Sequence, residues 1–330
     1  MNTMESTTES ITESPAQHPA MDTAPRPEDT RLSDRIRELR TLRLFCWNLW
    51  YGGAEVDAGR AKQAEVLRDQ PADIVFLQEC LGDAAVELGR SAGMTVAQQD
   101  FDTAVMTAAP VRLLPTGTAP YATAALVQTR IGEVLAWSVH LGPWDYGPYR
   151  GAELPEKAEE VFGQHGERQR DEQAAKVLEE TARLQAELGG SGPQLPVIVA
   201  GDFNVPSSLD WNGSHRPAAR WPATQRFMDA GYTDAFRTVH PDPDAAPGRS
   251  WSQIEPLGKE PRDRIDFIYL LGLDVDSADH LGDAADSDDA PQDAGFTSYG
   301  GRCRHIPEQR GNAFPSDHLA VRATVRRAEP

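Results

Sequence analysis

Four polar side chains end four strand-like runs of the sequence: Asn48, Glu79, His140 and Asp202. Alternate residues of a strand share a face, so each of these side chains shares its face with apolar or small neighbours. The run before Asp202, Pro-Val-Ile-Val-Ala-Gly, is typical of a strand buried on both faces. A single residue of this kind is most often an ordinary strand end that faces water. Four together, two of them acids, indicate a site built on strand ends.

A second group of residues predicts an acid/base couple. Asp266 lies within the apolar run 264–271 and shares a face with Ile268 and Leu270. A buried carboxylate is costly without a partner, and histidine suits it because the carboxylate fixes the histidine tautomer and stabilises the charged form. His318 lies at a boundary between a loop and a strand and follows Asp317. Alone, His318 is typical of a structural residue; beside two acids it indicates chemistry.

The oxygen donors among these residues favour a hard divalent cation. They are Asn48, Glu79, Asp202, Asn204 and Asp317. Such ligands suit Mg²⁺ or Mn²⁺ rather than zinc, and no paired histidines stand at zinc spacing. Because protein-bound Mg²⁺ usually takes one or two carboxylates, waters and a substrate phosphate oxygen, the pattern predicts phosphoryl chemistry.

The elements that position these residues alternate between strand-like and helix-like patterns. Runs rich in Val, Ile, Leu and aromatics, bounded by Gly, Pro and Asp, predict strands at residues 42–48, 73–79, 103–107, 122–130, 134–140, 196–201, 264–271 and 318–325. Amphipathic spacing predicts helices at residues 60–69, 83–91, 168–188 and 222–230. Some strands alternate with helices, and 122–130 with 134–140 form a hairpin-like pair. This mixture suits two packed sheets with helices outside.

One domain is predicted over residues 41–327. Residues 1–40 are predicted to be a disordered N-terminal segment, with a short helical turn conceivable at 34–40, because Thr, Ser, Pro and Glu dominate the start of the chain and bury too little apolar surface to offset the ordering entropy. Residues 274–295 are dense in aspartate and are predicted to form a solvated acidic loop.

Composition limits the classes of partner. The formal net charge of −19 makes a DNA-binding enzyme less expected, because proteins that grip DNA without sequence preference usually carry a basic surface. Cys46, Cys80 and Cys303 form no metal-type spacing and are predicted to be free thiols in a reducing cytoplasm. We find neither a secretory signal nor an apolar run long enough to span a bilayer, and we expect a cytoplasmic monomer that does not bind membranes.

Six motifs in order resemble the endonuclease/exonuclease/phosphatase superfamily, the fold of DNase I, inositol-polyphosphate 5-phosphatases and bacterial sphingomyelinases. They are Phe-Cys-Trp-Asn-Leu-Trp at 45–50, Val-Phe-Leu-Gln-Glu at 75–79, Ser-Val-His-Leu at 138–141, Gly-Asp-Phe-Asn at 201–204, Asp-Arg-Ile-Asp-Phe-Ile-Tyr at 263–269 and Ser-Asp-His at 316–318. Each motif is weak alone, but six in order span nearly all of the predicted domain. The loop after His140 resembles one in actinobacterial members of unassigned substrate.

The resemblance implies a DNase I-like four-layered α/β sandwich, in which helices flank two central mixed β-sheets and the metal lies at one end of the sheets. It implies that Glu79 is the principal metal ligand. It also implies that Asn48 and Asp317 lie close to the same ion or its waters.

The resemblance also implies catalytic roles. Asp202 and Asn204 would orient the attacking water and a phosphate oxygen, and His140 would bind the scissile phosphate. His318, paired with Asp266, would act as acid/base or stabilise the transition state; the residue that takes the proton from water stays open. Positioning and positive charge do most of the work in phosphoryl transfer in either case.

The loop after His140 carries candidate substrate contacts. Trp144, Tyr146 and Tyr149 could stack on a base or sugar, or could pin their own loop. Arg170 and Gln173 match a family pattern in the next helix, where Arg170 could face the phosphate or lie exposed on the helix. Five residues before the Ser-Asp-His motif could form a basic rim to the pocket: Tyr299, Arg302, Arg304, His305 and Arg310. Packing roles are predicted for Trp211, Trp221 and Trp251.

The sequence therefore predicts a metal-dependent phosphatase or phosphodiesterase that acts on a small soluble, nucleotide-like phosphate. A DNA or RNA nuclease is the alternative among enzymes. A non-catalytic binding protein on the same fold is the alternative of another class, and the complete set of metal and acid/base residues speaks against it.

Overall fold

The computed structural model describes residues 39–189, 194–285 and 295–328. One mixed sheet has the strand order β12-β11-β13-β1-β2-β4-β3. In chain order its strands are β1 (Thr41–Asn48), β2 (Ile74–Gln78), β3 (Thr95–Gln98), β4 (Ala104–Thr107), β11 (Leu273–Gly282), β12 (Phe296–Ser298) and β13 (Ala320–Arg327).

The second mixed sheet has the order β5-β6-β7-β8-β10-β9. Its strands are β5 (Val111–Leu114), β6 (Ala122–Thr129), β7 (Gly132–His140), β8 (Val197–Asp202), β9 (Thr233–Asp234) and β10 (Asp266–Leu271). The helices are α2 (Gly59–Asp69), α3 (Ala84–Ala92), α4 (Ala158–Phe162), α5 (His165–Gly189), α6 (Pro222–Asp229) and α7 (Ala235–Val239), and short 3₁₀ turns lie at Tyr51–Gly53, Gly147–Glu153 and Gln309–Gly311.

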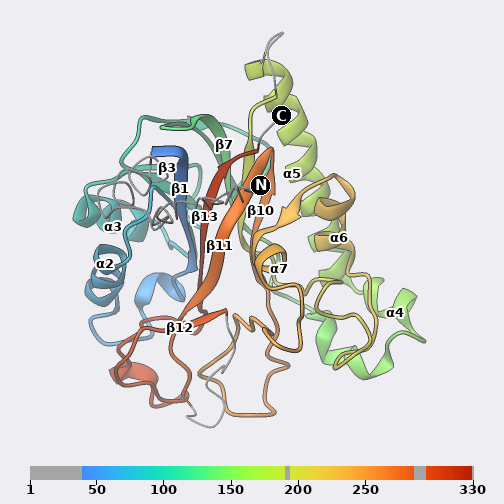
Figure 1. The fold of residues 1–330 in the computed structure, drawn as a ribbon. Coiled ribbons are helices and arrows are strands. Elements are labelled where there is room, and N and C mark those ends of the chain that lie inside the picture. Colours follow the sequence, from blue (N-terminus) through green and yellow to red (C-terminus); the bar gives the residue numbers. More distant parts are fainter. Residues whose placement is uncertain (1–38, 190–193, 286–294, 329–330) are drawn as a thin grey trace, which may run out of the picture. The chain divides into compact units, whose positions relative to one another are not determined.

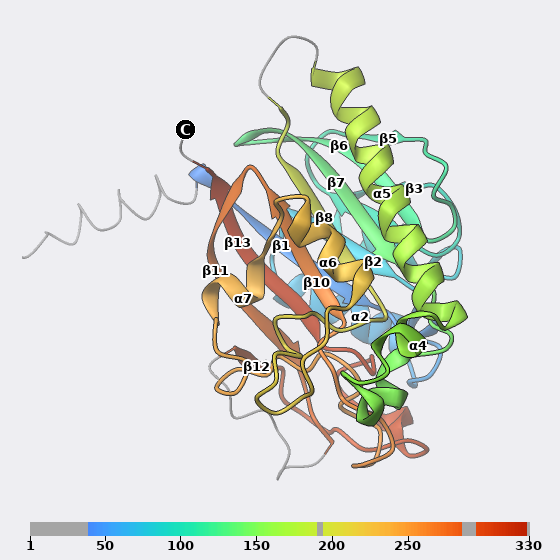
Figure 2. The same cartoon turned by 90° about the vertical axis from the view of Figure 1, so that its right-hand side faces the viewer.

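The two sheets face each other, with α2 and α3 outside one and α5 and α6 outside the other (Figures 1 and 2). Strand periodicity explains this order: on β1, Leu44 and Cys46 pack between the sheets, whereas Phe45 and Trp47 pack under α2 and α3. A third core lies between the second sheet and α5, where Val177 is fully buried. Each central strand is thus buried on both faces, which confirms the predicted four-layered α/β sandwich.

The eight predicted strands and four predicted helices are all present, with ends shifted by a few residues. Besides the longer strand β11, the sequence prediction missed β3, β5, β9 and β12 and the helices α4 and α7. These six elements are five residues or shorter, which is too short for a periodic pattern to separate them from a loop. Short length does not account for the missed strand β11.

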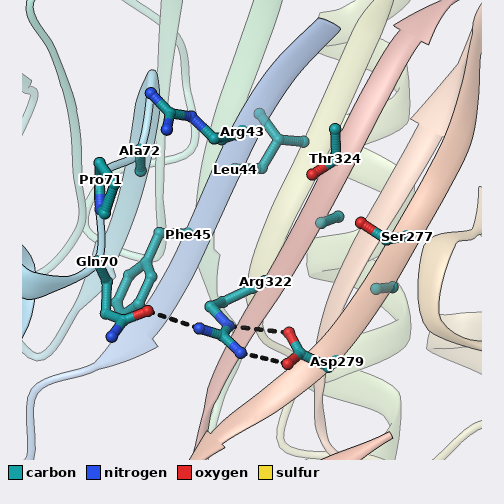
Figure 3. Close-up of a pocket in the computed structure, with 12 residues that line it drawn as sticks. Arg43, Leu44, Phe45, Gln70, Pro71, Ala72, Ser277, Asp279, Arg322 and Thr324 are labelled. Atoms are coloured by element: carbon teal, nitrogen blue, oxygen red, sulfur yellow. Dashed lines mark hydrogen bonds and ion pairs between the residues drawn. The ribbon is translucent and has the colours of Figure 1, made fainter. Parts of the chain in front are cut away.

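The predicted acidic loop 274–295 is wrong over its first part, because residues 273–282 form β11 and pair with β13. The aspartates of β11 meet arginines of β13. Arg322 Nε lies 2.8 Å from Asp279 Oδ1, in a surface pocket of about 370 Å³ (Figure 3). Arg326 reaches Asp274 at 2.8 Å in the same way. Cross-strand ion pairing, which composition does not reveal, turns this acidic stretch into a strand; residues 286–294 lie outside the described part.

The three cysteines are free, as predicted. Among the residues described, no helix is both long and apolar enough to cross a membrane. The N-terminal segment predicted to be disordered lies outside the described residues except for its last two positions.

Gly201 on β8 provides a test of how tightly the two central strands are joined. A Cβ at this position would lie 1.9 Å from the backbone oxygen of Val139 on β7. We expect Gly201→Ala to lower the free energy of unfolding by about 1–3 kcal/mol or more, because the strands must separate. The measurement is urea unfolding beside Gly117→Ala, whose nearest neighbour atom would be 3.6 Å away; equal unfolding midpoints for the two variants would contradict this account.

Candidate active site

The polar strand ends meet at one edge of the facing sheets. β1 runs parallel to β2, and β7 runs parallel to β8, so Asn48, Glu79, His140 and Asp202 lie at the carboxyl ends of their strands. Asp266 begins β10 and lies opposite Asp202 in the antiparallel register. Because β13 is antiparallel to β1, the chain that enters β13 starts at the same edge. Strand direction alone therefore gathers residues that are far apart in sequence.

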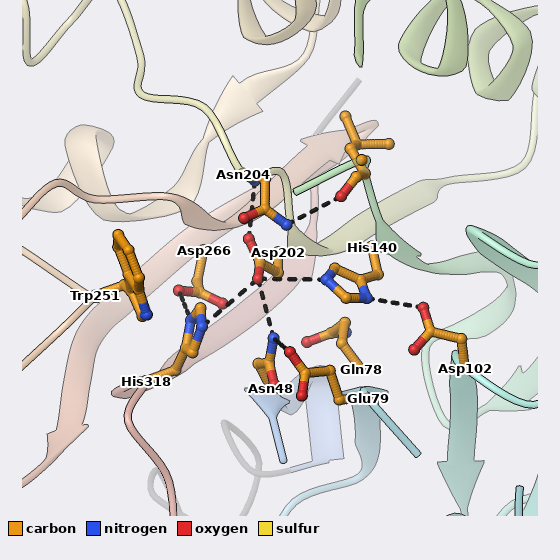
Figure 4. Close-up of polar contacts among 12 residues, drawn as sticks. Asn48, Gln78, Glu79, Asp102, His140, Asp202, Asn204, Trp251, Asp266 and His318 are labelled. Atoms are coloured by element: carbon orange, nitrogen blue, oxygen red, sulfur yellow. Dashed lines mark hydrogen bonds and ion pairs between the residues drawn. The ribbon is translucent and has the colours of Figure 1, made fainter. Parts of the chain in front are cut away.

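Asp202 occupies the centre of this group (Figure 4). Its Oδ2 accepts a hydrogen bond from Asn48 Nδ2 at 3.0 Å and lies 3.7 Å from Nε2 of both His140 and His318. Its Oδ1 accepts from the Asn204 backbone N–H at 2.8 Å. Burial and the nearby Asp266 raise the pKa of Asp202 to about 6, against the lowering effect of the two histidines.

Each of these histidines is paired with a carboxylate through its other ring nitrogen. His318 Nδ1 lies 2.9 Å from Asp266 Oδ2, and His140 Nδ1 lies 2.8 Å from Asp102 Oδ2. Burial by itself lowers the pKa of His140, but the hydrogen bond and charge of Asp102, together with the charges of Asp202 and Glu79, outweigh it and raise the pKa to about 9. Burial likewise opposes the charged form of His318, yet Asp266 and the other acids hold its pKa well above the usual value. Both shifts favour the charged imidazolium over the neutral imidazole.

Asp102 was absent from the residues that the sequence indicated. It stands just before β4, and β4 is antiparallel to β2, so the start of β4 reaches the edge where β2 ends. Nothing in the local sequence marks this acid, because its role depends on that strand pairing.

Glu79 and Asp317 form the acidic side of the site. Glu79 Oε2 accepts a hydrogen bond from the Tyr51 backbone N–H at 2.5 Å. Asp317 Oδ2 accepts from Trp251 Nε1 at 2.9 Å, whereas its Oδ1 is buried without a hydrogen-bond donor. Burial raises the pKa of Asp317 to about 6, and the charge of Glu79 adds to the rise although His318 opposes it. Asp317 Oδ1 lies 4.0 Å from His318 Nε2. A buried carboxylate oxygen without a hydrogen-bond donor, near the charge of Glu79, fits a divalent cation held by oxygen ligands.

Asn48 and Trp251 contact the acids of this side. Asn48 presents its amide nitrogen to Glu79 at 3.2 Å and to Asp202, while its oxygen accepts from the Trp50 backbone N–H at 2.9 Å. Asn48 thus orients the two acids through its amide nitrogen. Trp251, predicted to serve packing, donates to Asp317 and lines the cleft, because its indole N–H reaches the acid from the loop before β10.

A second group of possible metal ligands overlaps the catalytic cluster. One ligand atom each of Asp202, Asp266 and His318 lies within 4.8 Å of the others. In this structure the ligand atoms face one another: His318 Nδ1 lies 2.9 Å from Asp266 Oδ2, and His318 Nε2 lies 3.7 Å from Asp202 Oδ2. A metal ion bound here would require the neutral imidazole and would replace these contacts.

The cleft above these residues has a volume of about 930 Å³. Trp144, Tyr146 and Tyr149 all line it, and the Trp144 and Tyr149 side chains are 72% and 59% exposed. Tyr146 is buried and donates its hydroxyl to Asp263 Oδ2 at 2.9 Å. Part of this loop is thus pinned by its own aromatics, and part is open to a ligand.

The predicted basic rim is wrong. None of its five residues is among the described residues that line the cleft. Arg304 is 2.9 Å from Glu308, and Arg310 is 3.0 Å from Asp57. Proximity in sequence to the Ser-Asp-His motif did not bring these cations to the site, because the chain folds back through a 3₁₀ turn before the motif.

A family model described as the Endonuclease/Exonuclease/phosphatase family matches residues 45–325. The chain belongs to this family. Family members are generally metal-dependent phosphoester hydrolases. An uncharacterized protein of Caenorhabditis elegans is 28% identical over 302 residues, covering 85% of this chain and 90% of the relative.

Solved structures show the same fold. An endonuclease/exonuclease/phosphatase family protein of Bacteroides thetaiotaomicron matches with a TM-score of 0.53 and 16% identity, over 88% of this chain and 98% of its own. TDP2 of D. rerio, solved with a single-strand DNA product, matches with a TM-score of 0.53 and 17% identity, over 87% and 99%. A family member of Beutenbergia cavernae gives a TM-score of 0.50 at 16% identity, over 88% and 72%.

In this chain, Arg170 lies buried under the loop after His140 and does not line the cleft. The prediction that Arg170 faces the phosphate is therefore wrong. Its side chain is 0% exposed and donates to the backbone oxygens of Gly142 at 2.7 Å, Trp144 at 2.9 Å and Asp145 at 3.0 Å. Glu167 Oε1, 2.5 Å away, completes its partners. Arg170 thus anchors the loop after His140 from beneath. Gln173 supports the same loop by accepting from the Gly142 backbone N–H at 2.8 Å.

Substituting Arg170 tests this anchoring role. Arg170→Met leaves Glu167 as a buried unpaired charge, so we expect the free energy of unfolding to fall by about 3–5 kcal/mol. Arg168→Met, at an exposed position of the same helix, is the matched control and should stay within about 0.5 kcal/mol of wild type. Urea unfolding measures both; equal losses in the two variants would show that Arg170 is not the anchor.

Proposed function

We propose that the chain is a Mg²⁺- or Mn²⁺-dependent hydrolase of phosphoester bonds, acting as a phosphatase or phosphodiesterase on a small soluble phosphate. The observation that carries this proposal is the placement of Asp202 between two carboxylate-paired histidines, beside the acids Glu79 and Asp317. This arrangement offers a proton acceptor, two cationic donors and a cation site around one position, which is what attack of water on a phosphate requires.

Glu79 and Asp317 would hold the divalent cation, with Asn48 and Trp251 fixing the direction of their carboxylates. When bound, the cation supplies positive charge to the phosphoryl oxygens. The two carboxylates lie on separate chain segments, β2 and the approach to β13, so correct pairing of β1 with both strands sets their separation.

The remaining residues handle the proton and the developing charge. Asp202 Oδ1 is held by the Asn204 N–H. Oδ2 accepts from Asn48 and faces both histidines, and its remaining lone pair would receive a proton from the attacking water. His140 and His318 direct Nε2 toward this position while their Nδ1 atoms contact Asp102 and Asp266. The imidazolium N–H groups would stabilise charge on the phosphoryl oxygens as the water oxygen bonds to phosphorus and the ester oxygen leaves.

A nuclease is the second candidate. The likeness to TDP2 of D. rerio, a structure solved with a single-strand DNA product, favours a nucleic acid phosphodiester. The net charge of −19 and a cleft without Lys or Arg among its described lining residues favour a small substrate, because DNA binding draws on cationic phosphate contacts. We therefore propose a small phosphate, rather than a nucleic acid, as the substrate.

Metal removal tests the central proposal. Hydrolysis of a generic phosphoester such as 4-nitrophenyl phosphate or its bis ester should stop in EDTA and return with Mg²⁺ or Mn²⁺. Glu79→Gln removes a charged ligand, so we expect metal affinity measured by calorimetry to fall by about 10–100-fold, with thermal unfolding near wild type. Glu133→Gln, an exposed change outside the cleft, is the control. Full activity in EDTA, or rescue by zinc alone, would refute the assignment.

A double-mutant cycle tests the His318–Asp266 couple. His318→Ala should lower kcat by about 10²–10⁴-fold, and Asp266→Asn should lower it strongly as well, because the carboxylate orients the ring and holds its proton. The double variant should be little worse than His318→Ala, since residues that act as a unit are not additive. The measurement is kcat of the two single variants and the double variant under one assay, with folding checked by thermal melting. Strictly multiplicative losses would uncouple the pair, and near-wild-type activity in His318→Ala would remove its catalytic role.

A further inference from the structure

The cleft has an unusual chemical composition for a site that meets phosphates. Among its described lining residues, His140 and His318 are the basic side chains, and none is Lys or Arg. Arg150, which directly follows the lining loop, is paired with Glu153 and Glu160. Arg170, beneath the loop, has its guanidinium engaged by three backbone oxygens and Glu167. Cationic contacts are therefore concentrated at the scissile position and are lacking along the rest of the cleft.

An aromatic wall runs from the catalytic histidine toward the mouth of the cleft. The ring centroid of His318 lies 6.2 Å from that of Trp251, which lies 6.0 Å from Tyr146. Tyr146 in turn meets Tyr149 edge to face at 5.4 Å. The wall is rigid at its centre, since Tyr146 is buried and bonded to Asp263. The exposed rings of Tyr149 and, at the rim, Trp144 can stack on a flat ring at low entropic cost.

Acidic groups stand at the outer end of this wall. Glu260 lines the cleft, and its Oε2 accepts the Tyr149 hydroxyl at 2.6 Å. Asp145 also lines the cleft and is exposed. A substrate that carried a second phosphate along the wall would bring it near Glu260, and the neighbouring cation Lys259 is already paired with Glu255 at 2.6 Å. Like charges placed together at a binding surface reduce affinity and exclude the wrong partner.

We propose that the substrate is a phosphoester that carries a flat aromatic ring and no phosphate other than the scissile one, and that Glu260 rejects substrates with a second phosphate. This inference rests on the proposed hydrolase function and narrows its substrate class. The ring lies along the wall of Trp251, Tyr146 and Tyr149, with Trp144 open to solvent at the rim, and the scissile phosphate lies at His140 and His318.

A matched pair of substrates tests the proposal: thymidine 5′-(4-nitrophenyl phosphate) and the same compound with a 3′-phosphate. With Mg²⁺ or Mn²⁺, kcat/KM for the 3′-phosphorylated compound should be lower by about tenfold or more, because of like-charge repulsion. Glu260→Gln keeps an acceptor for Tyr149 and removes the charge, so it should reduce this ratio to about threefold or less. Glu133→Gln should leave the ratio unchanged. Trp144→Ala should raise KM for the first compound more than it lowers kcat.

Binding separates this inference from the hydrolase proposal. Calorimetry with thymidine 5′-phosphate and thymidine 3′,5′-bisphosphate, in the presence of Mg²⁺, should show the monophosphate binding about tenfold more tightly. No turnover of any phosphoester together with this binding preference would refute the hydrolase and keep the ligand class. Turnover with equal or better use of the bisphosphate-type compounds, efficient nicking of plasmid DNA, or an unchanged ratio in Glu260→Gln would overturn the inference and leave the hydrolase in place.

Discussion

The site depends on one buried carboxylate, Asp202, held where the ends of two sheets meet. A buried acid is costly unless its oxygens are occupied, and four neighbours of Asp202 serve that need: an amide from the first sheet, a backbone N–H after its own strand, and two imidazoles. The same contacts fix the edges of the sheets relative to each other, because Asn48 belongs to β1 and Asp202 to β8. The same contacts therefore position the catalytic residues and hold the two sheets together.

The two histidines reach Asp202 from opposite sides, and both are oriented by a carboxylate. In each, Nδ1 is occupied by a carboxylate, so Nε2 is the atom that faces the shared position. The acids that hold the protons come from β10 and from the loop before β4, whereas the histidines come from β7 and the approach to β13. Each pair therefore spans two chain segments. The protonation of the site depends on correct tertiary assembly rather than on any local sequence.

Sequence reasoning reached the residues that end regular strands, because a polar side chain after an apolar run is visible without the fold; Asn48, Glu79, His140 and Asp202 are of this kind. It also found the buried pairing of Asp266 with His318, since an acid on an apolar face demands a partner. It did not find Asp102, whose role is set by the antiparallel placement of β4. It misjudged Arg170, because a helical arginine that lies under a loop has the same sequence pattern as one that faces a ligand or solvent. The acidic strand β11 was missed for a similar reason, since its charges are matched only across the sheet.

The anchor beneath the loop at 142–145 has a consequence for how such a site can change. Arg170 contacts only main-chain oxygens of this loop, so its grip does not depend on which side chains the loop displays. Trp144 is exposed and borders the cleft, and it can therefore be exchanged while the backbone that follows His140 keeps its course. Asp145 adopts a φ of 49°, which favours Asp, Asn or Gly at that position. Library selection at position 144 is thus a direct route to altered ligand preference.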